Sequence, residues 1–363
     1  SIPSIPGGKV APTIPSRRGA GKFHPLGFAG PCSRSAKALS LPFARRRAIL
    51  ESHVFRPASI RQTLAGKSPS LIGIGLMIAA TVGFACMHGG VRYLSVRLQL
   101  HPFEIAFFRN LFGLLALAPW FVRYGVRPLR TNRIGLHTLR AVFNVAAMLL
   151  FFTGLSLSPI AQVQALAFTA PLFASLLAVV FLGERMLLWR WMALIVGFAG
   201  ALIIVHPEAG TLDPGSLAVL GSSAVWSFAI IMIKTLSRTD SSVTITSYMV
   251  LLMTPMSLIP AVFVWQWPGA VQLAWLVFVG VSGTLAQLAM AQALRMADTT
   301  TVLPLDFTKL VWGSIIGYFL FDEIPDAAIW IGGAVIFSAA TYIAYRESRR
   351  KITKSPLAQG GEG

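Results

Sequence analysis

Long apolar runs recur along this chain from Leu71 onward, each of about 18 to 22 residues, enough for a helix to cross the roughly 30 Å core of a bilayer. The strands of a membrane β-barrel are shorter, about 9–11 residues, and alternate apolar with polar side chains. The runs therefore predict an all-α integral membrane protein. Ten transmembrane helices are expected, at residues 71–91, 103–121, 136–155, 161–182, 189–206, 215–234, 243–264, 270–292, 299–321 and 327–345.

The net charge of +18 needs a separate explanation, because strong basicity can indicate nucleic-acid binding. Residues 1–70 hold 12 Lys and Arg against the single acid Glu51, so +11 of the charge lies in this segment. Its Pro, Gly, Ser and Arg content predicts a disordered basic N-terminal extension. The open readings are a solvated extension without a specific role, a segment that rests on anionic headgroups, and an organellar targeting sequence. No nucleic-acid partner is expected.

The remaining basic residues are distributed unevenly between alternate connections of the predicted helices. With the N-terminus inside, 14 Lys and Arg after residue 70 fall on cytoplasmic segments, whereas the opposite side carries only Arg92 and Arg97. Cytoplasmic loops of membrane proteins carry such an excess of Lys and Arg. The pattern predicts a membrane protein with both termini in the cytoplasm, ending in a cytoplasmic tail at residues 346–363.

The two halves of the apolar region align with each other at a shift of 139 residues. Phe168 then falls on Phe307, Glu184 on Glu323, and Trp191 on Trp330. The predicted units are residues 71–206 and 215–345, each with five helices. Because five is odd, the second unit would enter the membrane inverted relative to the first, as in many secondary transporters.

These features resemble the EamA branch of the drug/metabolite transporter superfamily. The resemblance rests on Leu182-Gly183-Glu184 and Phe321-Asp322-Glu323 at the ends of the fourth and ninth helices, on Trp226 followed by Lys234, and on Phe108-Arg109-Asn110. It implies alternating-access transport of a small metabolite across the inner membrane. The second helix and the basic second loop are similar to those of carriers for riboflavin- or S-adenosylmethionine-like solutes, with an amino acid as the competing substrate.

A few ionisable side chains lie within the predicted helices, where charges are costly and usually face a partner or a water-filled path. Pro304 cannot donate a backbone hydrogen bond and is expected to distort the helix at this point. Asp306 and Lys309 share one helix face just after it, so they are either a structural ion pair or a proton or cation site. Arg109 either binds an anionic substrate group or balances Asp306, or it is a snorkelling or structurally paired arginine; its depth favours the functional role. A proton is the candidate coupling ion.

Each of the other polar residues has a structural explanation as well as a functional one. His88 is either a satisfied interior histidine or a proton-linked group. Arg140 is expected to snorkel toward the cytoplasmic interface, and Glu323 to cap the helix that follows it. Hydrogen bonding and stacking groups that could line a solute path, or serve contacts between helices, are Asn144, Gln164, Trp226, Tyr248, Gln287 and Trp312.

The sequence also lacks several motifs. It has no phosphate-binding loop of the G-x-x-x-x-G-K-[ST] type and no cluster with metal-ligand spacing, so neither a cofactor nor a metal is expected. A membrane-embedded enzyme of lipid metabolism and a non-transporting scaffold remain the alternatives to a carrier. Oligomeric state stays open, with a homodimer as one option.

Overall fold

A computed structural model describes residues 69–124, 131–182, 188–205, 213–236, 239–240, 242–297 and 302–353. Every regular element in these ranges is a helix. The predicted N-terminal extension lies outside them except for its last two residues, and Glu184 lies outside them as well. The all-helical expectation is thus confirmed for the described part of the chain.

Seven described helical segments are long and apolar enough to cross a membrane. They are Leu71–Val96, Ile134–Leu157, Ile160–Val179, Leu188–Val205, Pro214–Ile233, Ala270–Met296 and Ala327–Arg346. Helix α10 (Ser242–Val262) contains a shorter apolar stretch, Ser247–Val262. The protein is therefore a multi-pass membrane protein, whereas the count of ten spans stays a prediction.

Two of the expected helices are interrupted. The fourth consists of α6 (Ile160–Ala167) and α7 (Ala170–Leu182), and the ninth of the 3₁₀ helix η3 (Leu303–Phe307) and α13 (Thr308–Phe321). The distortion after Pro304 was expected, because proline lacks a backbone donor. The break at Phe168 was not expected. There the amide of Thr169 bonds to Leu166 O at 3.0 Å, so the helix tightens into a turn before α7 begins.

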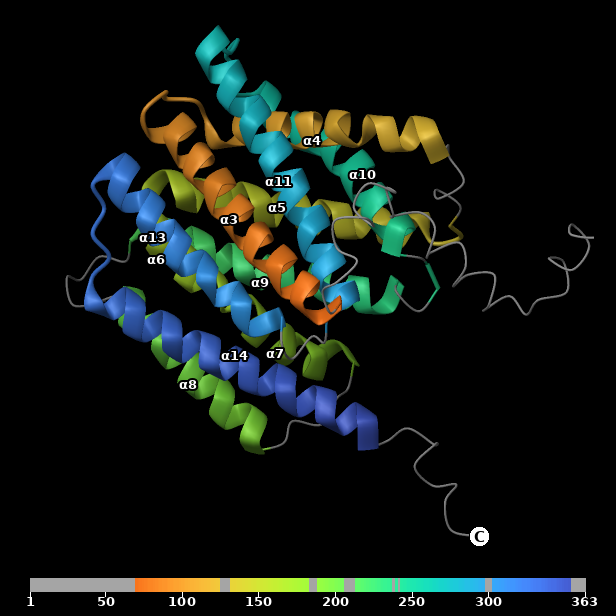
Figure 1. Cartoon of the computed structure of the whole chain (residues 1–363), viewed down its shortest axis with the longest axis vertical. Helices are drawn as coiled ribbons and strands as arrows, with labels where there is room; N and C mark the ends of the chain where they lie inside the picture. Colours follow the sequence, from red (N-terminus) through yellow and green to blue (C-terminus); the bar gives the residue numbers. More distant parts are fainter. Residues whose placement is uncertain are drawn as a thin grey trace, which may run out of the picture. The chain divides into compact units, whose positions relative to one another are not determined.

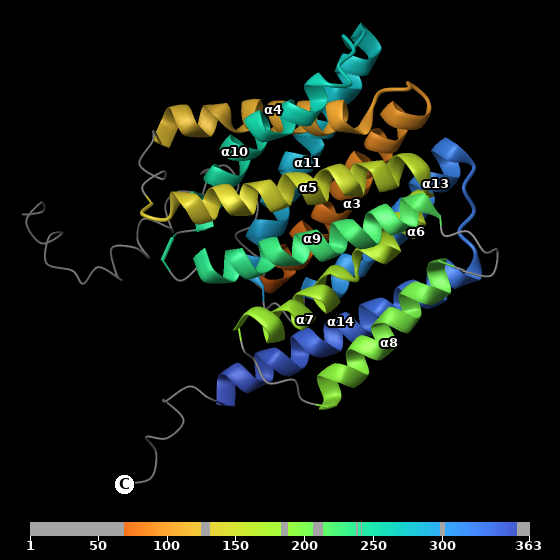
Figure 2. The ribbon, with the colours of Figure 1, turned by 180° about the vertical axis from the view of Figure 1, so that it is seen from behind.

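Long helices lie side by side in pairs that join the two halves of the chain. Helix α3 (Pro69–Val96) packs along α11 (Ala270–Met296), and α5 (Ile134–Leu157) along α9 (Pro214–Leu236) (Figures 1 and 2). In the same way α8 (Leu188–Val205) lies against α14 (Ala327–Thr353). Helix α4 (Pro102–Tyr124) contacts both α10 and α11.

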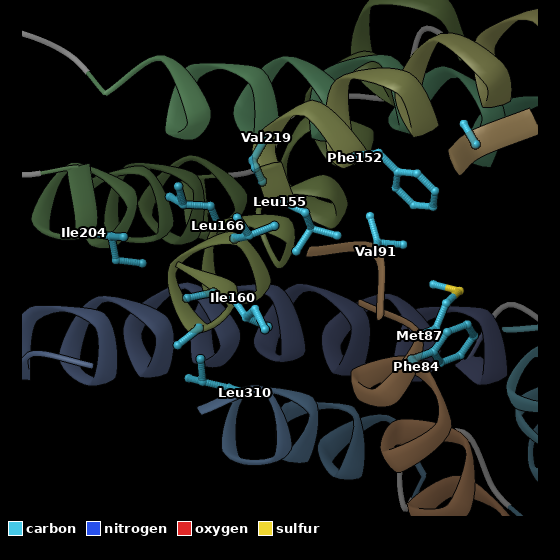
Figure 3. Close-up of a cluster of buried hydrophobic side chains, with 14 of the residues drawn as sticks. Phe84, Met87, Val91, Phe152, Leu155, Ile160, Leu166, Ile204, Val219 and Leu310 are labelled. Carbon is cyan, nitrogen blue, oxygen red and sulfur yellow. The ribbon is translucent and has the colours of Figure 1, made fainter. Parts of the chain in front are cut away.

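A shared apolar core holds these helices together. Figure 3 shows side chains of α3, α5, α6 and α13 in this cluster, including Val91, Leu155, Ile160 and Leu310, which are fully buried. Because close packing and internal hydrogen bonds stabilise helix contacts inside a bilayer, this core fixes how the two halves meet. The polar side chains described next lie on the same helices.

Candidate functional site

Arg109 occupies the first half of α4 and faces a cavity between three helices. Its Nη1 donates to Oδ1 of Asn110 at 3.0 Å, and Nδ2 of Asn110 donates to Oγ of Ser257 on α10 at 3.1 Å. The buried Nε of Arg109 has no hydrogen-bond partner among the described residues. This chain of contacts orients the guanidinium and leaves part of its donor capacity free.

The cavity beside Arg109 is lined by polar groups and by flexible apolar side chains. Residues of α4, α10 and α11 form its wall: Arg109, Asn110, Gly113, Leu117, Met249, Val250, Met253, Thr284, Gln287 and Leu288. Its volume is about 30 Å³, room for about one or two water molecules. In this conformation the helices must separate before an organic solute can occupy the site.

Glycines bring α4 and α11 close enough to form this wall. A Cβ atom on Gly280 would lie 2.6 Å from Cβ of Phe112 and 3.2 Å from the carbonyl oxygen of Arg109. A Cβ on Gly113 would lie 2.7 Å from Oγ1 of Thr284. Any larger residue would push the helices apart, so the glycines set the position of Arg109.

A second polar group forms where α3 meets the broken helices. Gln164 of α6 lies 3.5 Å, Nε2 to Nδ1, from His88 of α3, whose ring is 5.0 Å from that of Phe151. The amide of Gln164 fits against Gly313 of α13, where a Cβ would lie 2.6 Å from its Cδ. The structure thus brings together two of the predicted site residues, His88 and Gln164, across three helices.

Asp306 and Lys309 form an ion pair beside this group. Nζ of Lys309 is 2.5 Å from Oδ1 of Asp306 and 4.9 Å from the centre of the Phe84 ring on α3. Oγ1 of Thr308 lies 2.9 Å from Oγ1 of Thr81, which adds a second polar link to α3. The predicted sharing of one face by Asp306 and Lys309 is therefore confirmed. What the pair does is a separate question.

Several of the predicted lining residues carry buried polar atoms without a partner among the described residues. Besides Arg109, these are Asn144, whose side-chain oxygen and nitrogen are both unpaired, Gln164 at Oε1, and Trp312 at Nε1. Buried polar atoms are normally hydrogen-bonded, and an unpaired one costs free energy. Asn144, Gln164 and Trp312 therefore keep hydrogen-bonding capacity that no described residue satisfies.

Two predicted residues lie apart from these groups. The ring of Tyr248 stacks on His137 at 4.6 Å, and Nε2 of His137 is 2.7 Å from Oδ2 of Asp240. Trp226 is 37% exposed. Burial opposes ionisation of Asp240, but hydrogen bonds from Thr131 and His137 outweigh it and hold its pKa below the ordinary value.

The structure corrects two expectations. Arg140 does not snorkel, because it is 5% exposed and its Nη1 donates to the carbonyl oxygen of Ile245 at 3.0 Å. Glu323 accepts a hydrogen bond at 3.1 Å from the amide of Ile160, the first residue of α6, whereas Asp326 bonds the first turn of α14. Glu323 therefore caps a helix in the first half of the chain.

Sequence reasoning also missed the main partner of Glu323. Arg92 of α3 pairs with its carboxylate, and donates to the carbonyl oxygens of Leu155 and Ser158 at 2.8 and 2.6 Å. The available signal was that Arg92 and Glu323 are both charged residues predicted on the same side of the membrane. Their sequence separation of 231 residues hid the contact.

The long apolar helices define a multi-pass membrane protein, and the described bundle has broken helices and unpaired polar atoms in its interior. The chain belongs to the EamA-like transporter family, whose model matches residues 71–206 and 213–345. A solved crystal structure with a TM-score of 0.51 and 20% identity covers 79% of this chain and 98% of its own, and supports the fold alone.

This chain also aligns with several individual relatives over nearly the whole length of each relative. The chain is 33% identical over 296 residues to a riboflavin transporter of Vibrio cholerae, covering 80% of this chain and 99% of that protein. It is 32% identical to an S-adenosylmethionine uptake transporter of Rickettsia bellii, covering 78% and 97%. A riboflavin transporter of Brucella anthropi is 31% identical and is covered to 98%.

Proposed function

We propose that this protein is a secondary transporter that moves a small organic metabolite across the inner membrane by alternating access. The observation that carries the proposal is family membership, together with the similarity to named transporters over nearly their full length. A riboflavin-like or S-adenosylmethionine-like solute is the first candidate, and an amino acid the next. The named functions of the relatives favour a carrier over a membrane-embedded enzyme or a scaffold.

The proposed architecture has ten spans in two inverted units of five, residues 71–206 and 215–345. Both helix breaks support it, because Phe168 and Phe307, equivalent at the shift of 139 residues, lie at the two breaks and stack with ring centres 5.8 Å apart. Helix contacts support it too. In the repeat, α9 corresponds to α3, α11 to α5, and α13 to α7. Helix α3 packs on α11 and α13, and α9 packs in the same way on α5 and α7. Such pairing is expected of two repeats related by a pseudo-two-fold axis.

The same architecture places both termini in the cytoplasm, with residues 346–363 as the cytoplasmic tail. The excess of Lys and Arg on alternate connections supports this orientation. Labelling of single cysteines introduced at Arg97 and at Arg133 in intact cells and in inverted vesicles tests it. We expect the cysteine at position 97 to react from outside and the one at position 133 from the cytoplasm. The reverse pattern would contradict the orientation.

The coupling step is assigned to Asp306. In the present conformation Nζ of Lys309 lies 2.5 Å from Oδ1 of Asp306 and neutralises its carboxylate, and His88 is a further titratable group close to Lys309. We propose that Lys309 leaves Asp306 during the cycle and that a proton or a cation takes its place. With Asp306→Asn, uptake driven by a pH gradient should be lost while exchange of solute for solute persists. Unchanged gradient-driven uptake would contradict this role.

The experiment for the function itself combines binding and flux. A thermal-shift screen of the purified protein in detergent, with riboflavin, S-adenosylmethionine and amino acids, selects binders. Flux of the best binder is then measured in proteoliposomes. The proposal expects saturable, protein-dependent flux of at least one solute. Chemical conversion of the solute would point to an enzyme, and the absence of both flux and conversion to a scaffold.

A further inference from the structure

Some charged side chains inside the described helices have an ion-pair partner of opposite charge, and others do not. Lys309 and Asp306 neutralise each other, and Arg92 pairs with Glu323. Arg109 has no ion-pair partner among the described residues, and its nearest acid along α4, Glu104, accepts instead from the amide of Gln266 at 2.8 Å. Arg140 likewise has no ion-pair partner among the described residues, but it donates to the carbonyl oxygen of Ile245 at 3.0 Å, whereas Arg109 donates to the side-chain amide of Asn110.

An uncompensated charge inside a membrane protein is costly, so a structural role alone explains Arg109 poorly. Its contacts do not spread the charge, because Nη1 donates to the neutral Asn110 and Nε has no partner among the described residues. A guanidinium presents a planar fork of donors that matches a carboxylate, a phosphate or a pair of carbonyl oxygens. The cavity that it faces also offers Thr284 and Gln287 as hydrogen-bonding groups.

The rest of the cavity wall indicates the polarity of the part of the ligand that does not contact Arg109. Leu117, Met249, Val250, Met253 and Leu288 form an apolar surface with adaptable methionines. Such a wall suits the flat or apolar body of an organic solute. A cationic solute would bring a second positive charge beside Arg109, and in the present conformation the carboxylate of Asp306 is paired with Lys309.

We infer that Arg109 is the binding residue for an anionic or paired-carbonyl group of the transported solute, and that the protein selects neutral and anionic solutes over net cations. This inference rests on the proposed transport function and narrows its substrate class. Among the solutes considered above, it favours a flavin, with its imide carbonyls, over S-adenosylmethionine. The latter has a carboxylate that could meet Arg109, but its ammonium and sulfonium groups give it a net positive charge at neutral pH.

Binding of three probes of different charge tests the inference. The purified protein is titrated with riboflavin, with its phosphate ester and with S-adenosylmethionine, and flux of each is measured in proteoliposomes. We expect at least one flavin to bind and S-adenosylmethionine to bind at least about tenfold more weakly. Preferential binding of S-adenosylmethionine, or binding of none of the three, would overturn the inference.

Variants at Arg109 supply the second test. Arg109→Gln should weaken binding of the flavin about tenfold or more, and Arg109→Lys should restore part of it. Arg97→Gln removes an exposed positive charge at the end of α3 and should change nothing. Unchanged flavin binding in Arg109→Gln would contradict the inference even where flux continues, whereas flavin binding without flux would contradict only the transport function.

The melting temperature of the solute-free protein separates binding from a structural role. An uncompensated charge kept for a ligand destabilises the empty protein, so Arg109→Gln should melt at the same or a higher temperature than the parent protein. A structural arginine would give the opposite result. A marked loss of stability in Arg109→Gln would therefore overturn the inference, even if that variant fails to bind.

Discussion

The guanidinium of Arg92 on α3 and the carboxylate of Glu323 after α13 form an ion pair that joins the two halves of the chain. Nε of Arg92 donates to Oε1 of Glu323 at 2.6 Å, and the two side chains are only 11% and 14% exposed. Both groups also bond to the backbone where α5 ends and α6 begins. Because two charges and several backbone groups depend on this pair, its loss should be costly.

Glu323→Gln is expected to destabilise the protein. The change leaves Arg92 buried without an opposite charge, and breaking such a pair costs about 3 kcal/mol. Thermal unfolding in detergent, followed by tryptophan fluorescence, measures the loss. The adjacent Asp322 supplies the control, because it is exposed and has a φ of 57°, which asparagine also tolerates. Equal melting temperatures for Glu323→Gln and Asp322→Asn would contradict the account.

Arg140→Ala should also be destabilising, by about 2 kcal/mol, because it removes the buried hydrogen bond to the carbonyl oxygen of Ile245 and opens a cavity. A snorkelling arginine would predict almost no effect. Arg97→Ala removes an exposed arginine and serves as the matched control. If the two variants unfold at the same temperature, the buried role of Arg140 is wrong.

Acid should weaken the start of α9 through Asp213. Burial alone would raise the pKa of Asp213, but hydrogen bonds from Ser158 and from the side chain and backbone of Ser216 hold it below the ordinary value of an aspartate. Its stabilising contribution is therefore complete above the ordinary pKa and is lost as the pH falls through the lowered one. Asp213→Asn should melt below the parent protein at pH 7, and the difference should shrink at pH 3. A difference that does not change with pH would contradict this.

Gly313→Ala should impair solute binding more than it impairs folding. A methyl group there would strike the amide of Gln164, with 2.6 Å to its Cδ, and displace this side chain from His88. Gly75 of α3 has open space around its Cα, so Gly75→Ala should bind normally and gain up to about 1 kcal/mol of helix stability. Isothermal titration with the solute chosen in the screen compares the two variants. Equal affinities would exclude Gln164 from the site.

The sequence predicted the elements that depend on local pattern. Apolar run length located the helices, Pro304 indicated the distorted turn, and the spacing of Asp306 and Lys309 predicted their contact. The break at Phe168 was not predicted, although Pro171 signals it: proline has no amide hydrogen, so the helical bond back to the carbonyl oxygen of Ala167 cannot form. The chain crosses the break in a tight turn, in which the amide of Thr169 bonds to the carbonyl oxygen of Leu166.

Contacts between distant segments could not be predicted in the same way. Glu323 caps α6, which lies 163 residues earlier in the chain, and Arg140 reaches Ile245 over 105 residues. A single sequence indicates which residues are charged and how deep they lie, but their partners depend on how the helices pack. For this reason Arg109 was predicted as a site residue while its cavity, between α4, α10 and α11, was not.

Counterflow in proteoliposomes tests the central claim most directly. Vesicles containing the purified protein are loaded with unlabelled riboflavin and diluted into a trace of labelled riboflavin, with empty vesicles as the control. A carrier that alternates access exchanges solute across the membrane, so the account predicts a transient accumulation of label that Arg109→Gln abolishes and Arg97→Gln retains. Equal label in protein-containing and empty vesicles, for riboflavin and for every solute that binds, would contradict it.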